Sequence, residues 1–295
     1  PNQKIGLGHE VAGEVVKIGA KVTKFKVGDK VLIEPGVPDD TCEYCRTGRY
    51  NICPGVDFMA TQPNYKGALT QYMTHPEEWT YHIPEGMTTM EGALVEPAAV
   101  GMHAAVLGGA QPGKSIVILG GGTIGLMVLQ ACISLGATDI TVVDVIEKRL
   151  ELAKKLGAAR VINGKEEDTV AVLRSEEMYG DHGVDLVFEA AGAVFTAQQA
   201  VQIVSRGGKI MMVGTQSKPV PIDFLKINRE VTIQTSFRYC NNFPQTIEAI
   251  SSGRFNVKDM VTNIYDYEDV QKAFEEAIDP VKKTEMVKGV IKVAE

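Results

Sequence analysis

Residues 115–125, which read SIVILGGGTIG, decide the fold of this 295-residue chain. The apolar run at 116–119 has the length and composition of a buried strand, and the glycines that follow it mark a tight turn. Apolar residues then recur with helical spacing from 124 to 135, and a second short apolar run at 140–143 is again typical of a strand. Together these elements predict a βαβ unit whose crossover is right-handed.

The glycines of this turn, Gly120, Gly122 and Gly125, have the GxGxxG spacing of a dinucleotide-binding turn. The first allows the tight turn, the second lets a pyrophosphate approach the backbone, and the third lets helix and strand pack closely. Asp144 ends the next strand, 19 residues after Gly125, where its carboxylate can bind both ribose hydroxyls of NAD and would repel the 2′-phosphate of NADP. We therefore predict NAD as the cofactor; the alternative is an ordinary glycine turn followed by a solvated aspartate.

The rest of the chain divides into a β-rich first part and an alternating α/β part. Short β-branched runs separated by Gly and Pro turns fill the first 96 residues, which predicts a small β-barrel or compact β domain. Further strands are expected at 184–188, 209–213 and 231–235, with helical stretches between most of them, which is the doubly wound parallel pattern of the α/β class. The tail predicts helices near 244–251 and 268–277 and a strand at 289–293.

Composition excludes several classes of function. The net charge is −7 and no dense run of Lys or Arg is present, so we expect no nucleic-acid partner. No apolar stretch approaches the roughly 20 residues of a membrane-spanning helix, and we expect a cytoplasmic protein without membrane contact. Five cysteines, three of them clustered with metal-like spacing, favour a reducing compartment over a disulfide framework.

Two further motifs carry a resemblance to a known family. Residues 8–13, GHEVAG, continue into a pattern with Gly19, Val22, Gly28 and Asp29, and residues 237–241 read FRYCN. The first motif resembles the zinc-site signature of the medium-chain alcohol dehydrogenases, and the second is similar to the sorbitol dehydrogenase branch. The resemblance implies a doubly wound Rossmann sheet at 97–236 and a GroES-like, β-rich catalytic domain made of 1–96 and 237–295. It also implies oxidation of a sorbitol-, L-iditol- or xylitol-type polyol to a ketose, with NAD as hydride acceptor, by a homodimer or homotetramer.

The resemblance further implies a catalytic zinc bound by His9 and Glu10, with Glu96 contacting the metal or its water. Zinc would lower the pKa of a bound alcohol and stabilise the alkoxide as hydride leaves. Related enzymes use a cysteine some tens of residues before the His-Glu pair as another ligand, and only eight residues precede His9 here. We therefore expect that ligand to be missing from the sequence shown.

Substrate and cofactor contacts follow from the same resemblance. Arg238 is expected to pair with Glu96 and to donate to substrate hydroxyls, with Tyr239 in the same network, because a guanidinium can bind a carboxylate and still offer donors. Phe58 and Thr61 match positions that line the substrate pocket, although Phe58 could be plain core. The residues expected beside the cofactor, besides the glycines and Asp144, are Ile124, Arg149, Val213, Gly214, Thr215, Phe237 and Arg238.

A second zinc is predicted in the cysteine cluster. Cys42, Cys45 and Cys53 match three ligands of the family's structural zinc lobe, and Asp39 stands where the family has a fourth cysteine. A carboxylate oxygen and three thiolates form a sound zinc site. The alternative is a lobe that holds its shape without metal, with three idle thiols.

Two other functions stay open from the sequence. One is a different zinc alcohol dehydrogenase, such as a threonine-type enzyme, against which Arg238 and Tyr239 argue. The other is a catalytically silent NAD-binding protein, which the missing cysteine would produce.

Overall fold

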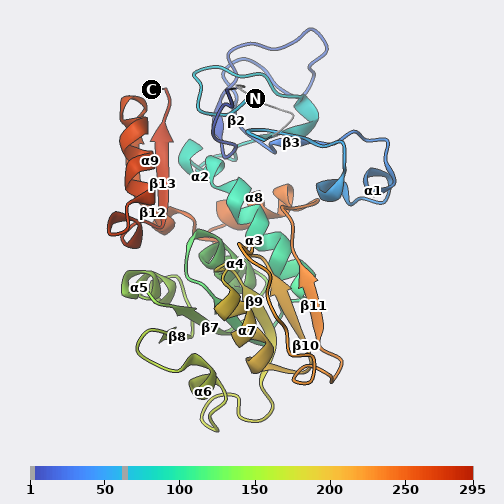
Figure 1. Ribbon diagram of the computed structural model, residues 1–295. Helices are drawn as coiled ribbons and strands as arrows, with labels where there is room; N and C mark the ends of the chain where they lie inside the picture. The colour runs from blue at the N-terminus through green and yellow to red at the C-terminus, as the bar shows by residue number, and fades with distance from the viewer. Residues whose placement is uncertain (1–3, 62–65, 295) are drawn as a thin grey trace.

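The computed structural model describes residues 4–61 and 66–294 (Figure 1). A six-stranded sheet with the order β11-β10-β9-β6-β7-β8 forms its centre, and every neighbouring pair of strands is parallel. The strands are β6 (Ser115–Leu119), β7 (Asp139–Asp144), β8 (Arg160–Asn163), β9 (Val184–Glu189), β10 (Val204–Met212) and β11 (Thr232–Thr235). The predicted α/β class with a doubly wound parallel sheet is confirmed.

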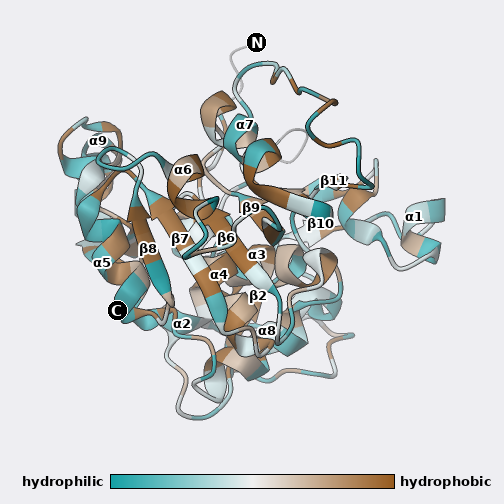
Figure 2. Cartoon of the chain, turned by 90° about the horizontal axis from the view of Figure 1, so that it is seen from below, coloured by the Kyte–Doolittle hydropathy of each residue, from teal (hydrophilic) through white to brown (hydrophobic). Residues whose placement is uncertain are grey.

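Helices cover both faces of this sheet, as alternate residues of β6 show. Ile116 and Ile118 join a core with helices α3 to α5 and α8, whereas Val117 and Leu119 face α6 and α7. All four side chains are fully buried, which explains why the sequence reads as a continuous apolar run. Figure 2 shows the apolar strands of the sheet between these layers.

The helices have the following bounds: α1 (Glu43–Arg46), α2 (Thr89–Ala93), α3 (Val95–Gly108), α4 (Thr123–Ser134), α5 (Glu147–Lys155), α6 (Thr169–Leu173), α7 (Val194–Ile203), α8 (Phe243–Ser251) and α9 (Val270–Ile278). A capping box between Thr88 and Glu91 begins α2. The long helix α3 connects the β-rich segments to the central sheet (Figure 1). It places Glu96, in its first turn, between the two parts.

The β-rich part consists of short strands in small sheets. An antiparallel sheet has the order β1-β2-β5, from β1 (Ala12–Glu14), β2 (Lys30–Ile33) and β5 (Thr80–His82), and β3 (Gly36–Val37) pairs with β4 (Asp57–Phe58). Within the described residues these sheets are open and form no closed barrel. The terminal strand β13 (Lys288–Lys292) pairs in parallel with β12 (Val261–Asp266), so it forms a separate two-stranded sheet, which packs against α9 (Figure 1).

One strand of the six-stranded sheet, β8, was not predicted. Its four residues include Arg160 and Asn163 and lie at the sheet edge, where side chains remain partly exposed and the apolar pattern is interrupted. Among the described residues, every helix is too short or too polar to pass through a bilayer.

Candidate active site

The glycine turn lies between β6 and α4 at the carboxyl edge of the central sheet. Gly120 has a φ of 109°, and a Cβ there would lie 2.9 Å from Ala191 N. A Cβ at Gly125 would lie 1.8 Å from the Gly120 carbonyl oxygen. Gly122 caps the N-terminus of α4. The turn therefore tolerates only glycine at Gly120 and Gly125, and it directs the first N–H groups of a helix toward the sheet edge, where anions bind well.

Asp144 holds this turn in place from the end of β7. Its carboxylate accepts hydrogen bonds from Gly121 N (2.7 Å), Val145 N (2.8 Å) and Ile146 N (2.9 Å). Arg149 Nη1 lies 3.7 Å from the same carboxylate, and Arg149 Nε is buried without a hydrogen-bond partner among the described residues. Asp144 and Arg149 therefore lie close together beside the turn.

The other positions expected beside the cofactor also meet at this edge. Val213, Gly214 and Thr215 follow β10, Phe237 follows β11, and Ile124 lies in the first turn of α4. A Cβ at Gly214 would lie 2.4 Å from Gly192 N, so the loops after β9 and β10 touch directly. Phe237 remains 52% exposed, which leaves its ring available to a ligand.

Glu189 organises these loops and was not singled out from the sequence. It is fully buried at the end of β9, and its side chain accepts hydrogen bonds from Ala191 N, Gly192 N, Thr196 Oγ1 and Gln216 Nε2, at 2.6 to 3.0 Å. Its carbonyl oxygen also accepts from Val213 N and Gly214 N. A charged residue closing the apolar strand VDLVFE was the signal that could have identified it.

His9, Glu10 and Glu96 form the candidate metal group. Their possible ligand atoms all lie within 4.8 Å of one another, and His9 Nε2 is 4.0 Å from Glu96 Oε1. Bonds of about 2.0 to 2.1 Å to a tetrahedral zinc would place such atoms about 3.3 Å apart. The residues therefore fit a cation whose coordination is completed by water or substrate. Lys288, from the distant strand β13, pairs with Glu10 and was not expected from the sequence.

Burial sets the protonation of this group. Desolvation raises the pKa of Glu96, and the charge of Glu10 raises it further. Desolvation likewise lowers the pKa of His9, against the opposing effect of Glu10. A neutral imidazole is the form that binds a metal, so the environment of His9 favours metal binding at neutral pH.

Arg238 does not form the expected ion pair with Glu96. Its guanidinium lies over the Phe58 ring, 3.7 Å from the ring centroid, and 4.7 Å from the centroid of Phe237. Stacking between two aromatic rings accommodates a planar cation that water no longer solvates fully. Among the described residues, the buried Nη1 atom of Arg238 has no hydrogen-bond partner. A donor therefore remains for a ligand near His9, whose ring also contacts Phe58 edge-on and whose pKa the charge of Arg238 helps to lower.

Tyr239 contributes a second unpaired donor. The residue is buried against Phe243, and desolvation together with the nearby Glu96 carboxylate raises its pKa well above the ordinary value. The hydroxyl lies near Glu96 but makes no well-formed hydrogen bond within the described part of the chain. Thr61, in contrast, is engaged, since its hydroxyl donates to Phe58 O at 2.8 Å. Phe58 itself is buried and contacts both His9 and Arg238.

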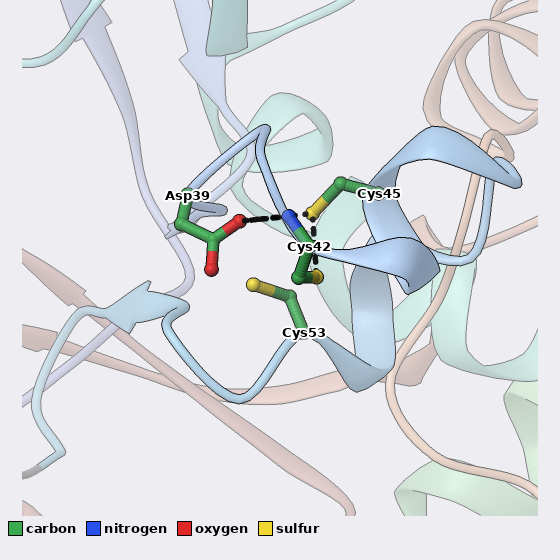
Figure 3. Close-up of side chains that lie close together, drawn as sticks. All are labelled: Asp39, Cys42, Cys45 and Cys53. Atoms are coloured by element: carbon green, nitrogen blue, oxygen red, sulfur yellow. Dashed lines mark hydrogen bonds between the residues drawn. The ribbon is translucent and has the colours of Figure 1, made fainter.

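The four lobe residues come together away from this group (Figure 3). Cys42 Sγ lies 3.4 Å from Cys45 Sγ, and Cys45 Sγ lies 3.6 Å from Asp39 Oδ1, with Cys53 beside them. Tetrahedral zinc with bonds of about 2.3 Å to sulfur needs neighbouring ligand atoms about 3.7 Å apart. Hydrogen bonds from Cys42 N and Thr41 N hold the pKa of Asp39 well below its usual range, so this carboxylate is charged at neutral pH. The set fits zinc.

Comparisons with known proteins agree with this arrangement. Residues 1–85 match the family described as alcohol dehydrogenase GroES-like domain, and residues 123–252 match the family described as zinc-binding dehydrogenase. The chain is 64% identical to the uncharacterized zinc-type alcohol dehydrogenase-like protein YdjJ of Escherichia coli, over 100% of this chain and 84% of that protein. It is 42% identical to the sorbitol dehydrogenase of Bacillus subtilis, over 92% of this chain and 77% of that enzyme.

A solved structure supports the same grouping. The crystal structure of ECK1772 from E. coli, described as an oxidoreductase/dehydrogenase of unknown specificity involved in membrane biogenesis, superposes with a TM-score of 0.97 and 63% identity. The match covers 100% of this chain and 84% of that one. With the glycine turn, the His9 group and the cysteine lobe in their places, the chain belongs to the zinc-type, medium-chain alcohol dehydrogenase family of oxidoreductases.

Proposed function

We propose that this protein oxidises a secondary hydroxyl of an open-chain polyol, of the sorbitol, L-iditol or xylitol class, to a ketone and transfers the hydride to NAD. The observation that carries the polyol assignment is the pair of buried, unpaired donors, Arg238 Nη1 and Tyr239 OH, beside the His9–Glu10–Glu96 group. Unpaired buried donors are costly, and a hydroxyl-rich substrate would satisfy both, whereas a simple alcohol would not. The 42% identity to a sorbitol dehydrogenase favours the same substrate class.

The residues around the candidate metal have separate roles in this proposal. His9 and Glu10 would hold zinc, which when bound polarises the alcohol oxygen. Lys288 keeps Glu10 in place, and Glu96, whose pKa burial raises, can hold or release a proton near neutral pH. Arg238 and Tyr239 would bind the neighbouring hydroxyls and so select which carbon faces the cofactor.

A substrate panel tests the proposal. With NAD and zinc present, kcat/KM should be higher for sorbitol, L-iditol or xylitol than for simple secondary alcohols of similar length, because only polyols engage both donors. Equal or higher efficiency on the simple alcohols would replace the polyol assignment with an unspecified zinc alcohol dehydrogenase.

We further propose that Asp144 selects NAD. Asp144→Ser should weaken NAD binding by about 1 to 3 kcal/mol, the value of a charge-assisted pair of hydrogen bonds, and should weaken NADP binding less. Because Asp144 also anchors the turn through Gly121 N, Asp144→Asn serves as the matched control that keeps the shape and removes the charge. Titration calorimetry with both dinucleotides measures the effect, and unchanged NAD affinity in both variants would remove the assignment.

The lobe is proposed to hold one zinc through Asp39, Cys42, Cys45 and Cys53. Three thiolates in a closed site exchange metal slowly, so one zinc per chain should survive mild chelation and disappear in Cys45→Ser. Cys132→Ala is the control, since this buried thiol of α4 belongs to neither candidate metal group of the described residues. The same chelator-resistant zinc in Cys45→Ser would contradict the assignment.

The proposal also assigns different roles to two parts of the chain. Residues 97–236 would bind the cofactor, and 1–96 with 237–295 would bind metal and substrate; the Lys288–Glu10 pair already joins the two ends of the latter unit. Phe224 and Leu225, 70% and 83% exposed and close in sequence to the edge strand β11, favour a homo-oligomer that covers them. We expect a dimer or tetramer in the cytoplasm.

A further inference from the structure

The cysteine lobe, residues 39–53, makes direct contact with the segment that carries Arg238, although the two are almost 190 residues apart. Asn51 Nδ2 donates to Phe237 O at 2.9 Å. Asn241 Nδ2 donates to Gly48 O at 2.9 Å, and Asn241 N donates to the Tyr50 hydroxyl at 2.8 Å. The lobe therefore bonds to the chain both directly before and shortly after Arg238.

The backbone between these bonds has an unfavourable conformation. Arg238 has a φ of 52°, in the left-handed region that an arginine seldom adopts, whereas Asn241, with a φ of 58°, is of a residue type that tolerates this region better. Such a conformation persists only where surrounding contacts hold it. The bonds from Asn51 and to Gly48 supply those contacts at Phe237 and Asn241.

The lobe is itself hydrogen-bonded to a buried carboxylate, that of Glu34. Tyr50 donates to Glu34 Oε1 at 2.7 Å, and Tyr81 of β5 donates to Glu34 Oε2 at 3.0 Å. Glu34 is fully buried directly after β2, and Tyr50 packs edge-on against Trp79. Phe237 and Arg238 are thus tied through the lobe to the sheet beside the candidate active site.

We propose that Asn51 is a positioning residue: through its bond to Phe237 O, the lobe holds the Arg238 guanidinium between Phe58 and Phe237 and thereby sets the preference for hydroxyl-rich substrates. The inference rests on the proposed function and adds to it a role for the lobe in substrate selection. Without the Asn51 donor, the peptide between Phe237 and Arg238 can turn, and the guanidinium leaves the position from which it reaches a substrate hydroxyl.

The effect should appear in binding of the polyol rather than in the chemical step. In the full chain, loaded with zinc, Asn51→Ala should raise KM for the preferred polyol about tenfold, the scale of one lost hydrogen bond, with little change in kcat. Kinetics on a simple secondary alcohol and the affinity for NAD should stay at the parent values. Asn51→Asp, which keeps the shape and removes the donor, should behave in the same way.

Thr47→Val is the matched control within the lobe. Thr47 Oγ1 donates to Glu43 O at 2.9 Å, so the variant removes a hydrogen bond inside the lobe without touching residues 237–241. It should lower stability slightly and leave the polyol KM unchanged. A polyol KM that rises equally in Thr47→Val and Asn51→Ala would mean that Asn51 only stabilises the lobe, and would overturn the inference.

A double-mutant cycle separates this inference from the proposed function. If Asn51 acts through Arg238, the variant with both Asn51→Ala and Arg238→Ala loses no more polyol efficiency than Arg238→Ala alone. Two results would contradict the positioning role while the proposed function stands. One is a double variant whose loss of polyol efficiency equals the sum of the two single losses. The other is an Asn51→Ala variant with parent kinetics when Arg238→Ala is defective. An Arg238→Ala variant with parent kinetics on polyols overturns both.

Discussion

Replacing Arg238 with alanine should lower kcat/KM for a polyol by at least about thirtyfold, on the order of 2 kcal/mol, while NAD binds as before. The guanidinium is stacked on Phe58 and Phe237 and has one buried nitrogen without a partner in the described structure. A substrate hydroxyl that pairs with this nitrogen gains a charge-assisted hydrogen bond that the alanine variant cannot offer. The glycine turn proposed to bind NAD is formed by other residues and should be unaffected.

The measurement is steady-state oxidation of sorbitol or xylitol beside oxidation of a simple secondary alcohol. The simple alcohol should lose much less efficiency, because it has no second hydroxyl for Arg238. Arg206→Ala, an exposed arginine on β10, is the control for loss of positive charge. Parent-like polyol oxidation in Arg238→Ala, or equal small losses on both substrates, would contradict the assignment of Arg238.

Replacing His9 with alanine should reduce turnover of every alcohol by at least on the order of a thousandfold, the scale of losing the group that stabilises the developing negative charge. His9 is one of only three candidate ligands gathered in the described part of this site, and its side chain is 41% exposed, so its loss should affect metal binding more than folding. The zinc proposed for the cysteine lobe should remain.

Metal content and turnover of the same preparation check this result. His82→Ala is the matched control, since His82 belongs to β5, has a side chain 56% exposed, and lies 3.9 Å from Asp29 rather than near a metal group. A His9→Ala protein with parent zinc content and parent turnover would place the catalytic metal elsewhere.

The fold could be predicted for strands whose side chains are buried on both faces of the sheet, because such strands are continuous apolar runs in the sequence. The run at Ile116–Leu119 is apolar at every position because each residue meets a helix layer, and the glycines after it follow from contacts that admit no side chain. Strand β8 lies at the edge, where its side chains are partly exposed and both of its end residues, Arg160 and Asn163, are polar, so its four residues gave no comparable signal.

The site could be predicted in its residues but only partly in its interactions. The motif at His9 and the cysteine spacing identified two separate groups, and the members of each group lie close together in space. The partner of Glu10 is Lys288, which comes from a strand at the other end of the chain and carries no local pattern. Arg238 was expected to neutralise Glu96, but Glu96 is buried beside Glu10, His9 and Tyr239, while two aromatic rings hold the guanidinium. Opposite charges in the sequence do not determine whether the Arg238 guanidinium binds Glu96 or aromatic rings, because stacking and the cost of desolvation compete with ion pairing.

Zinc-dependent formation of reduced NAD from a polyol tests the central claim most directly. Full-length protein is stripped of loosely held metal with a chelator, zinc is added back stepwise, and the absorbance of the reduced cofactor is followed with xylitol or sorbitol as substrate. We predict no turnover before zinc is restored, recovery with about one zinc bound per chain beyond that of the lobe, and formation of the matching ketose. Turnover that is unaffected by removing and restoring zinc, or a zinc-loaded protein that binds NAD and oxidises none of these polyols, would contradict the account.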